Sequence, residues 1–120
     1  MENSTPYFDR LYMKDPWLSF IQCEVITVFG KEGSVQKYKN WLGKTILLYN
    51  ENSKVHVKVI SVRHYRSIKE FLYNEDDNKY APHYVGDYKL IKKEYNKMNT
   101  DDDIERLGGF NSLYVMVLPK

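Results

Sequence analysis

The sequence has a single cysteine, Cys23, among 120 residues. A lone cysteine excludes an intrachain disulfide and a zinc site built from cysteines, and it favours a reducing intracellular compartment, cytoplasmic or nuclear. No apolar run approaches the roughly 18 residues that would cross a bilayer, and the polar residues 1–10 do not have the pattern of a signal peptide. We therefore expect no interaction with a membrane.

Metal-binding and phosphate-binding motifs are also missing. His56, His64 and His83 are widely separated, and no His-x-x-x-His or Cys-x-x-Cys pattern occurs. The three aspartates at 101–103 are explained by the preference for acids at a helix N-terminus. No phosphate-loop pattern surrounds the few glycines. We expect no metal and no cofactor.

The residues that are present have the composition of a folded globular protein, with 42% hydrophobic and 28% charged residues. The net charge is only +2, but residues 31–69 contain nine Lys and Arg against two Asp and Glu, whereas both flanks are acidic. This basic middle segment predicts one positive face. The alternative is a solvated, lysine-rich sheet surface. Abundant Lys, Asn and Tyr with little Ala are typical of an AT-rich genome, such as that of a large DNA virus or a parasite.

The spacing of apolar residues predicts an α+β fold in the element order α-β-β-β-α-α-β. Asp15 and Pro16 are typical of a helix start, and apolar residues at helical spacing extend that helix to about residue 23. Short helices are also possible at 34–42 and 99–106. Strands are expected at 25–29, 44–49, 54–64 and 110–118. In the third strand Val55, Val57 and Val59 alternate with polar residues, which predicts one buried and one wet face.

Two further helices are predicted from their caps. Ser67 with Glu70 three residues later has the pattern of a capping box. Asp87 is expected to cap a helix that reaches about residue 98. Residues 1–13 are expected to form a lead-in, and residues 14–120 a single domain.

Several local motifs follow one another in a set order. The first helix ends at Ile21, and residues 24–31 (EVITVFGK) lead into a strand. The third strand continues into residues 65–72 (YRSIKEFL), Pro82 precedes a helix with spaced tyrosines, and Gly109 precedes the last apolar strand. This ordered set spans about residues 14–118 and resembles the ASCH family of PUA-like domains.

The resemblance implies a PUA-like small β-barrel with flanking helices that binds RNA. Some bacterial relatives are amidohydrolases acting on N4-acetylcytidine, and a ribonuclease activity has been proposed for others. The catalytic lysine of that site falls at Ile26, whereas its threonine is kept as Thr27, and residues 81–84 lack the carboxylate that completes the site. The resemblance therefore implies a domain without intact catalytic residues, with Thr27 as a weak candidate. An alignment shift of two residues would bring Glu24 or Lys31 into the gap.

Basic and aromatic residues are interleaved in the middle of the chain. Lys and Arg neutralise phosphates, and aromatic rings stack on unpaired bases. We predict a cleft between the first helix, the first strand and the loop around residue 84, lined by Thr27, Lys31, Arg66, His83 and Tyr84, with Tyr65 and His64 beside it. Lys31 and Arg66 would hold phosphate, and Tyr84 would stack on a base. The alternatives are that Trp17, Phe29 and Trp41 are core residues and that the histidines are plain surface residues.

These patterns favour a nucleic-acid-binding domain, with RNA as the expected partner and single-stranded DNA as an alternative. A second interpretation is an enzyme that hydrolyses a modified nucleoside or RNA with displaced catalytic groups. A third is a protein-interaction module, because a fold does not determine a function. The sequence predicts neither the oligomeric state nor the identity of the ligand.

Overall fold

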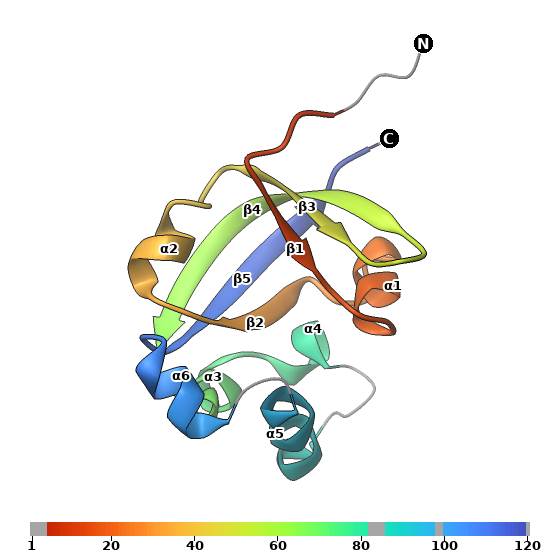
Figure 1. The fold of residues 1–120 in the computed structure, drawn as a ribbon. Coiled ribbons are helices and arrows are strands. Elements are labelled where there is room, and N and C mark those ends of the chain that lie inside the picture. Colours follow the sequence, from red (N-terminus) through yellow and green to blue (C-terminus); the bar gives the residue numbers. More distant parts are fainter. Residues whose placement is uncertain (1–4, 82–85, 98–99, 120) are drawn as a thin grey trace.

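The structure is a computed structural model that describes residues 5–81, 86–97 and 100–119. Its centre is a curled five-stranded sheet (Figure 1). The strands are β1 (Asp9–Tyr12), β2 (Val28–Glu32), β3 (Thr45–Tyr49), β4 (Lys54–Tyr65) and β5 (Phe110–Val117). They lie in the order β1-β3-β4-β5-β2, with β1 parallel to β3 and the other neighbours antiparallel. The sheet is therefore half of a barrel, and its two edges are β1 and β2.

The helices of the described residues are α1 (Trp17–Gln22), α2 (Val35–Lys39), α3 (Ile68–Asn74), α4 (Asp77–Tyr80), α5 (Tyr88–Asn96) and α6 (Asp101–Arg106). In Figure 1, α3 to α6 gather below β2, and α1 lies beside the end of β1. Asp87 caps α5 as predicted. None of these helices is long and apolar enough to cross a membrane. The predicted α+β class is confirmed. The structure adds β1 and α4, which were not predicted, and it contains α2 and α6 where the sequence allowed short helices outside the predicted order.

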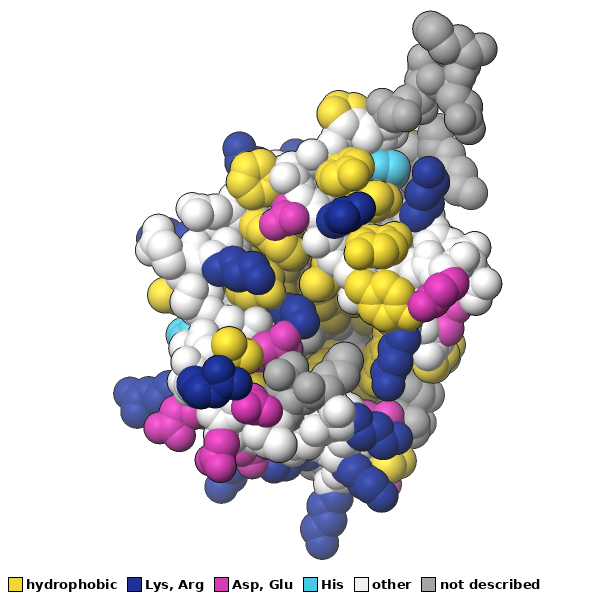
Figure 2. Space-filling view, viewed as in Figure 1, with side chains coloured by type: hydrophobic (Ala, Val, Ile, Leu, Met, Phe, Trp, Pro, Cys, Tyr) yellow, Lys and Arg dark blue, Asp and Glu magenta, His cyan; other side chains and the backbone are white. Residues whose placement is uncertain are grey.

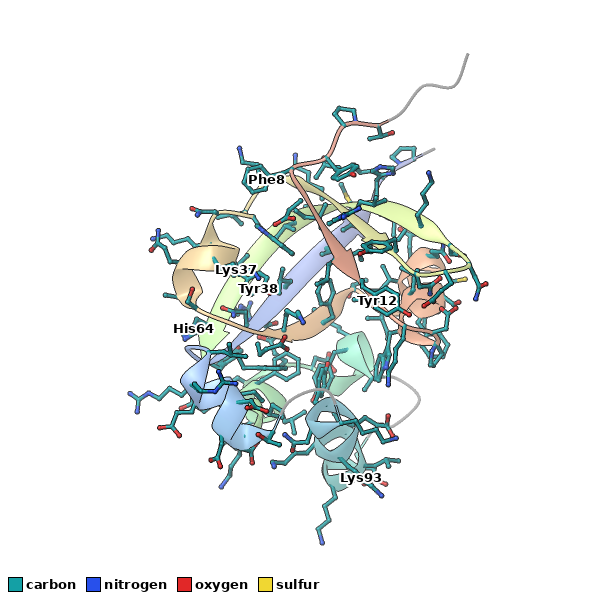
Figure 3. The ribbon with its side chains drawn as sticks, in the orientation of Figure 1. Phe8, Tyr12, Lys37, Tyr38, His64 and Lys93 are labelled. Atoms are coloured by element: carbon teal, nitrogen blue, oxygen red, sulfur yellow. The ribbon has the colours of Figure 1, made fainter. Side chains whose placement is uncertain are left out.

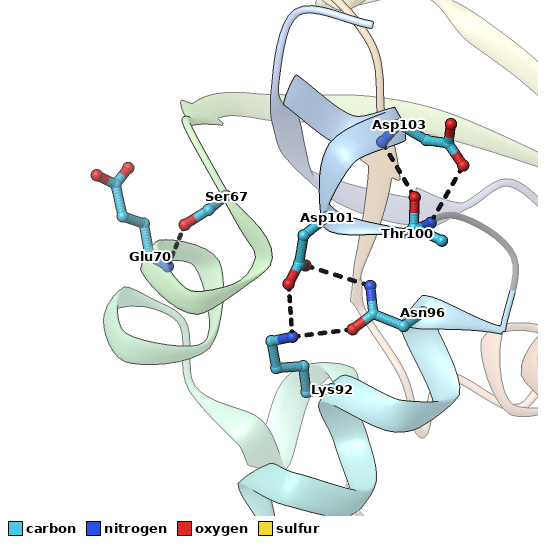
Figure 4. Close-up of polar contacts among 7 residues, drawn as sticks. All are labelled: Ser67, Glu70, Lys92, Asn96, Thr100, Asp101 and Asp103. Atoms are coloured by element: carbon cyan, nitrogen blue, oxygen red, sulfur yellow. Dashed lines mark hydrogen bonds and ion pairs between the residues drawn. The ribbon is translucent and has the colours of Figure 1, made fainter. Parts of the chain in front are cut away.

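The N-termini of α3 and α6 are capped by hydrogen bonds between residues three positions apart in the sequence (Figure 4). The hydroxyl of Ser67 accepts a hydrogen bond from the backbone N–H of Glu70 at 3.2 Å. The Glu70 carboxylate accepts from the backbone N–H of Arg66 at 2.9 Å, one residue earlier than in a capping box. Thr100 and Asp103 form a complete capping box on α6.

The first predicted strand begins three residues later than expected. It was predicted at 25–29, but β2 starts at residue 28. The backbone N–H groups of Val25 and Ile26 both donate to the carbonyl of Phe20, at 2.8 and 3.1 Å, and so close the end of α1. These two β-branched residues therefore lie at the end of a helix and not in a strand, because the backbone hydrogen bonds override their strand preference.

Part of the predicted lead-in belongs to the sheet. Backbone bonds from Phe8 to Thr45 (2.8 Å) and from Met13 to Tyr49 (2.9 Å) extend the pairing of β1 with β3. The ring of Tyr12 packs edge-on against that of Tyr49, with centroids 5.7 Å apart. Residues 9–12 therefore form one edge of the half-barrel.

Two hydrophobic clusters make up the core of the described residues. The first joins the inner residues of β3 and β4 to α1 through residues such as Leu18. The second joins α3, α5 and α6 to β2 and β5 around Phe71. Trp17 is half-buried and packs against both clusters. Phe29 and Trp41 are buried, which confirms their interpretation as core residues.

Candidate ligand-binding pocket

A pocket of about 320 Å³ opens between the two edges of the sheet. Residues 11–14 of β1 and its continuation form one wall, and residues 29–31 of β2 form the opposite wall. The remaining lining residues are Trp17 and Ile21 of α1, Ile26, and Glu94 and Tyr95 of α5. Figure 2 shows the surface hollowed between β1, α1 and α5, with hydrophobic side chains inside the hollow.

The pocket exists because the barrel is not closed. The edge strands β1 and β2 lie at opposite ends of the strand order, and an unpaired strand edge needs some cover. Here Trp17 and Tyr95 line the opening with stacked rings, whose centroids are 6.2 Å apart at an interplanar angle of 27°. The opening is therefore apolar and aromatic rather than a polar strand edge.

Several charged and phenolic groups border this pocket. The ammonium of Lys31 forms an ion pair with Glu32, and its side chain is 28% exposed. A hydrogen bond from Lys97 (2.8 Å) lowers the pKa of Glu94, so its carboxylate is charged at pH 7. Burial raises the pKa of Tyr95, which keeps its phenol neutral. The border thus combines two lysines, Lys14 and Lys31, with one ion-paired carboxylate.

Other side chains near the pocket are held in place by their own contacts. The hydroxyl of Tyr12 donates to both carboxylate oxygens of Glu51, at 2.6 and 2.9 Å. In Figure 3, Tyr12 lies at the end of β1 beside the opening, whereas Lys93 extends away from α5. Tyr12 is therefore fixed at the rim, and Lys93 does not contribute to the pocket.

Two residues singled out by the resemblance to the ASCH family lie in or near this pocket. Ile26, where that resemblance implied a lysine, is 1% exposed and forms part of the apolar wall. Thr27 does not line the pocket. Its backbone links the sheet to α4, because its N–H donates to the carbonyl of Lys79 (3.0 Å) and its carbonyl accepts from Val115 (2.9 Å).

Lys31 and Arg66, predicted to share one cleft, border different pockets. Lys31 lines the opening between the sheet edges, whereas Arg66 and His64 line a second hollow near Gly109. The two pockets have no lining residue in common. The separation arises because β5 lies between β2 and the end of β4, which leads into Arg66.

Tyr65 is partly buried and packs against the second core cluster. Its hydroxyl donates to the carboxylate of Glu75, and its ring packs edge-on against Phe71 with centroids 6.2 Å apart. Burial, and then the neighbouring Glu75, raise the pKa of Tyr65 to about 12. The ring is thus held against the core by Phe71 and Glu75. His83 and Tyr84, the other predicted binding residues, lie outside the described residues.

Tyr95 and Lys14 line the pocket, although neither was predicted as a binding residue. Tyr95 belongs to the predicted helix with spaced tyrosines, and this spacing is the available signal for it. Lys14 follows β1, a strand that was not predicted. No group of three or more His, Cys, Asp or Glu side chains suited to a metal occurs in the described part of the chain.

No family model matches the chain, and no curated protein matches it. Among solved structures, the crystal structure of hypothetical protein PH0355 matches with a TM-score of 0.79 and 19% identity, over 92% of this chain and 98% of that one. The solution NMR structure of protein PF0455 from Pyrococcus furiosus matches with a TM-score of 0.68 and 16% identity, over 94% of this chain and 98% of that one. At such identities the likeness concerns the fold alone. The chain therefore has the same α+β half-barrel fold as PH0355 and PF0455.

Proposed function

We propose that this chain binds single-stranded nucleic acid, with RNA preferred over DNA, and that the pocket between the sheet edges receives a base or nucleoside. The observation that carries the proposal is the aromatic, apolar opening of the half-barrel with lysines at its border. Its volume of about 320 Å³ is within the usual range of small-molecule pockets.

The chemistry of the pocket suits an unpaired base. The flat face of a base gains from contact with aromatic rings such as Trp17 and with the apolar wall that includes Ile26. Lys14 and Lys31 at the border would neutralise the phosphates on either side of that base. Figure 2 shows further Lys and Arg side chains around the hollow, interspersed with a few Asp and Glu.

We also propose that the chain is an ASCH-type, PUA-like domain that binds its ligand without hydrolysing it. The ordered motifs of the sequence and the curled five-stranded sheet support the family assignment. The buried Ile26 supports a non-catalytic site, because an aliphatic side chain supplies neither a base nor a nucleophile. The position of Thr27 outside the pocket lining supports the same conclusion.

Tryptophan fluorescence offers a direct test. The chain has two tryptophans, of which Trp41 is 3% exposed and Trp17 lines the pocket. In a Trp41→Phe variant, a base that stacks in the pocket should quench Trp17 as single-stranded RNA is added. Matched single-stranded DNA and duplex RNA serve as comparison ligands. Binding that leaves Trp17 fluorescence unchanged would refute the pocket assignment.

The salt dependence of binding tests the role of Lys31. Replacing Lys31 by Glu should weaken RNA binding and flatten the slope of log affinity against log salt by about one. Lys58→Glu is the matched control, because Lys58 is exposed on β4 and lines neither pocket. Equal affinities and slopes for the two variants would exclude a phosphate contact at Lys31. A folded protein with neither RNA binding nor nucleoside turnover would favour a protein-interaction module.

A further inference from the structure

A second, larger hollow of about 620 Å³ lies at the far end of β4, where α3, α5 and α6 meet the sheet. Its lining includes His64, Arg66, Lys69 and Lys92, together with Gly109. Figure 3 shows His64 at the end of β4, close to α6. The hollow is thus bordered by three permanent cations and one imidazole.

A buried asparagine determines the orientation and tautomer of His64. Asn111 is 0% exposed and lies between His64 of β4 and Lys31 of β2 in the sheet register. Its Nδ2 donates to the carbonyls of Lys31 (3.2 Å) and Gly33 (2.9 Å). Its Oδ1 therefore faces Nδ1 of His64 at 2.9 Å. Because this oxygen only accepts, Nδ1 of His64 carries the hydrogen.

The other imidazole nitrogen, Nε2, is consequently the one with a free lone pair. The ring lies against Gly109, whose φ is +115°, and a Cβ there would come within 2.8 Å of Nε2 and 2.6 Å of the Tyr65 carbonyl. Glycine at 109 leaves room for this ring. Among the described residues the structure shows no hydrogen-bond partner for Nε2. Nε2 accepts a bond when His64 is neutral and donates one when it is protonated.

The charges around the hollow do not cancel. Lys92 pairs with Asp101 (2.8 Å) and donates to Asn96 (3.0 Å), as Figure 4 shows. The hydrogen bond from Lys92 lowers the pKa of Asp101, so this pair stays ionised. The other lining carboxylate is Glu105. Arg66 and Lys69 form no ion pair within the described part of the chain. Among the lining residues outside the Lys92–Asp101 pair, two cations, Arg66 and Lys69, therefore oppose one carboxylate.

We propose that this hollow binds a phosphate group, held by Arg66 and Lys69 and by Nε2 of His64. A guanidinium suits the paired oxygens of a phosphate, and an imidazolium adds a further donor. The phosphate is carried either by a free nucleotide or by a nucleic-acid backbone. This site is separate from the base pocket and does not depend on the function proposed for that pocket.

Proton NMR of the histidine rings tests this site. The full-length protein is titrated with pH in the absence and presence of inorganic phosphate. A bound phosphate favours the imidazolium, so the pH at which the His64 Cε1–H resonance is half-titrated should rise by about half a unit or more. His56, which contacts Tyr7 at the other end of β4, is the internal control. No movement at His64, or an equal movement at His56, would overturn the proposal.

Variants identify the groups that hold the phosphate. Arg66→Gln and Lys69→Gln should each weaken phosphate binding about fivefold or more, and Lys58→Gln should leave it unchanged. His64→Gln should weaken phosphate binding relative to wild type by a larger factor at pH 5.5 than at pH 8, a ratio from which the titration of phosphate itself cancels. Wild-type affinity in both Arg66→Gln and Lys69→Gln would refute the site.

Two further arms identify the source of the phosphate. Adenosine monophosphate and a short single-stranded RNA are each added in competition with inorganic phosphate. Displacement by both indicates a phosphate of the nucleic-acid backbone, and displacement by the nucleotide alone indicates a small phosphorylated ligand. The base pocket is monitored separately through Trp17, so a failure of either proposal is recognised without reference to the other.

Discussion

Replacing Asn111 by Ala tests how the sheet is held together beside the second hollow. The Asn111 side chain makes three hydrogen bonds across three adjacent strands or their extensions, to Lys31, Gly33 and His64. The bond to the Gly33 carbonyl is buried, whereas the other two are partly buried. Removing the Asn111 amide leaves the carbonyls of Lys31 and Gly33 without this donor, in a region with little access to water.

The magnitude follows from the burial of each bond. A buried acceptor that loses its donor costs about 1–3 kcal/mol, and a partly buried one costs roughly half of that. The imidazole of His64 can instead bond to water, because the residue is exposed. We therefore expect Asn111→Ala to lower the free energy of unfolding by about 2–4 kcal/mol.

Urea unfolding measures this loss as a lower midpoint with an unchanged slope. Asn74→Ala is the matched control, because Asn74 makes one exposed hydrogen bond, from Nδ2 to the carbonyl of Glu70 (2.8 Å). It should cost no more than about 0.5 kcal/mol. The ¹⁵N shifts of His64 should also change from those of the Nδ1–H tautomer toward a mixture. A loss below about 1 kcal/mol, or an unchanged tautomer, would refute the reasoning.

Two further predictions concern packing and pH. In Gly30→Ala, the new Cβ would overlap the ring of Phe110, which is wedged between Phe71 and Tyr95 at centroid distances of 5.2 and 5.4 Å. We expect a loss of about 1–3 kcal/mol in urea unfolding. The loss should shrink when Phe110→Leu is also present, and purely additive effects would contradict the overlap. Hydrogen bonds from Lys92 and Asn96 lower the pKa of Asp101 in the folded protein. The stability from this group is therefore present above the unfolded-state pKa of about 3.9 and is lost as pH falls through the lower folded value. Asp101→Asn should thus lower the thermal midpoint at pH 7, with the difference shrinking as pH falls below 4, and a difference independent of pH would count against this ion pair.

Local signals predicted much of the fold correctly. The cap at Ser67 and the alternation of Val55, Val57 and Val59 depend only on residues a few positions apart, and all are found in the structure. The last apolar strand was predicted at 110–118, and β5 is found at Phe110–Val117, between β4 and β2. Side-chain periodicity and capping bonds are short-range, so the sequence is sufficient to predict them.

The pairing of β1 with β3 was not predictable in this way. Asp9 pairs with Ile46 across 37 positions of the chain, and the short segment at 9–12 has little strand pattern of its own. Asn111 was also missed as a structural residue, because a polar side chain in an apolar strand gives no sign of the three groups it will bond. Both depend on contacts that form only when distant segments meet.

The candidate site shows the same division. The sequence by itself determined that basic and aromatic side chains are interleaved between residues 31 and 69, and that residue 26 is an isoleucine, which supplies neither a base nor a nucleophile. Only the tertiary structure placed Lys31 and Arg66 in different pockets and brought Trp17 against Tyr95. The physical reason is that strand order and sheet closure decide which side chains share a cavity. Strand order and sheet closure depend on pairing between distant segments. Residue type and local periodicity can be read from neighbouring positions in the sequence.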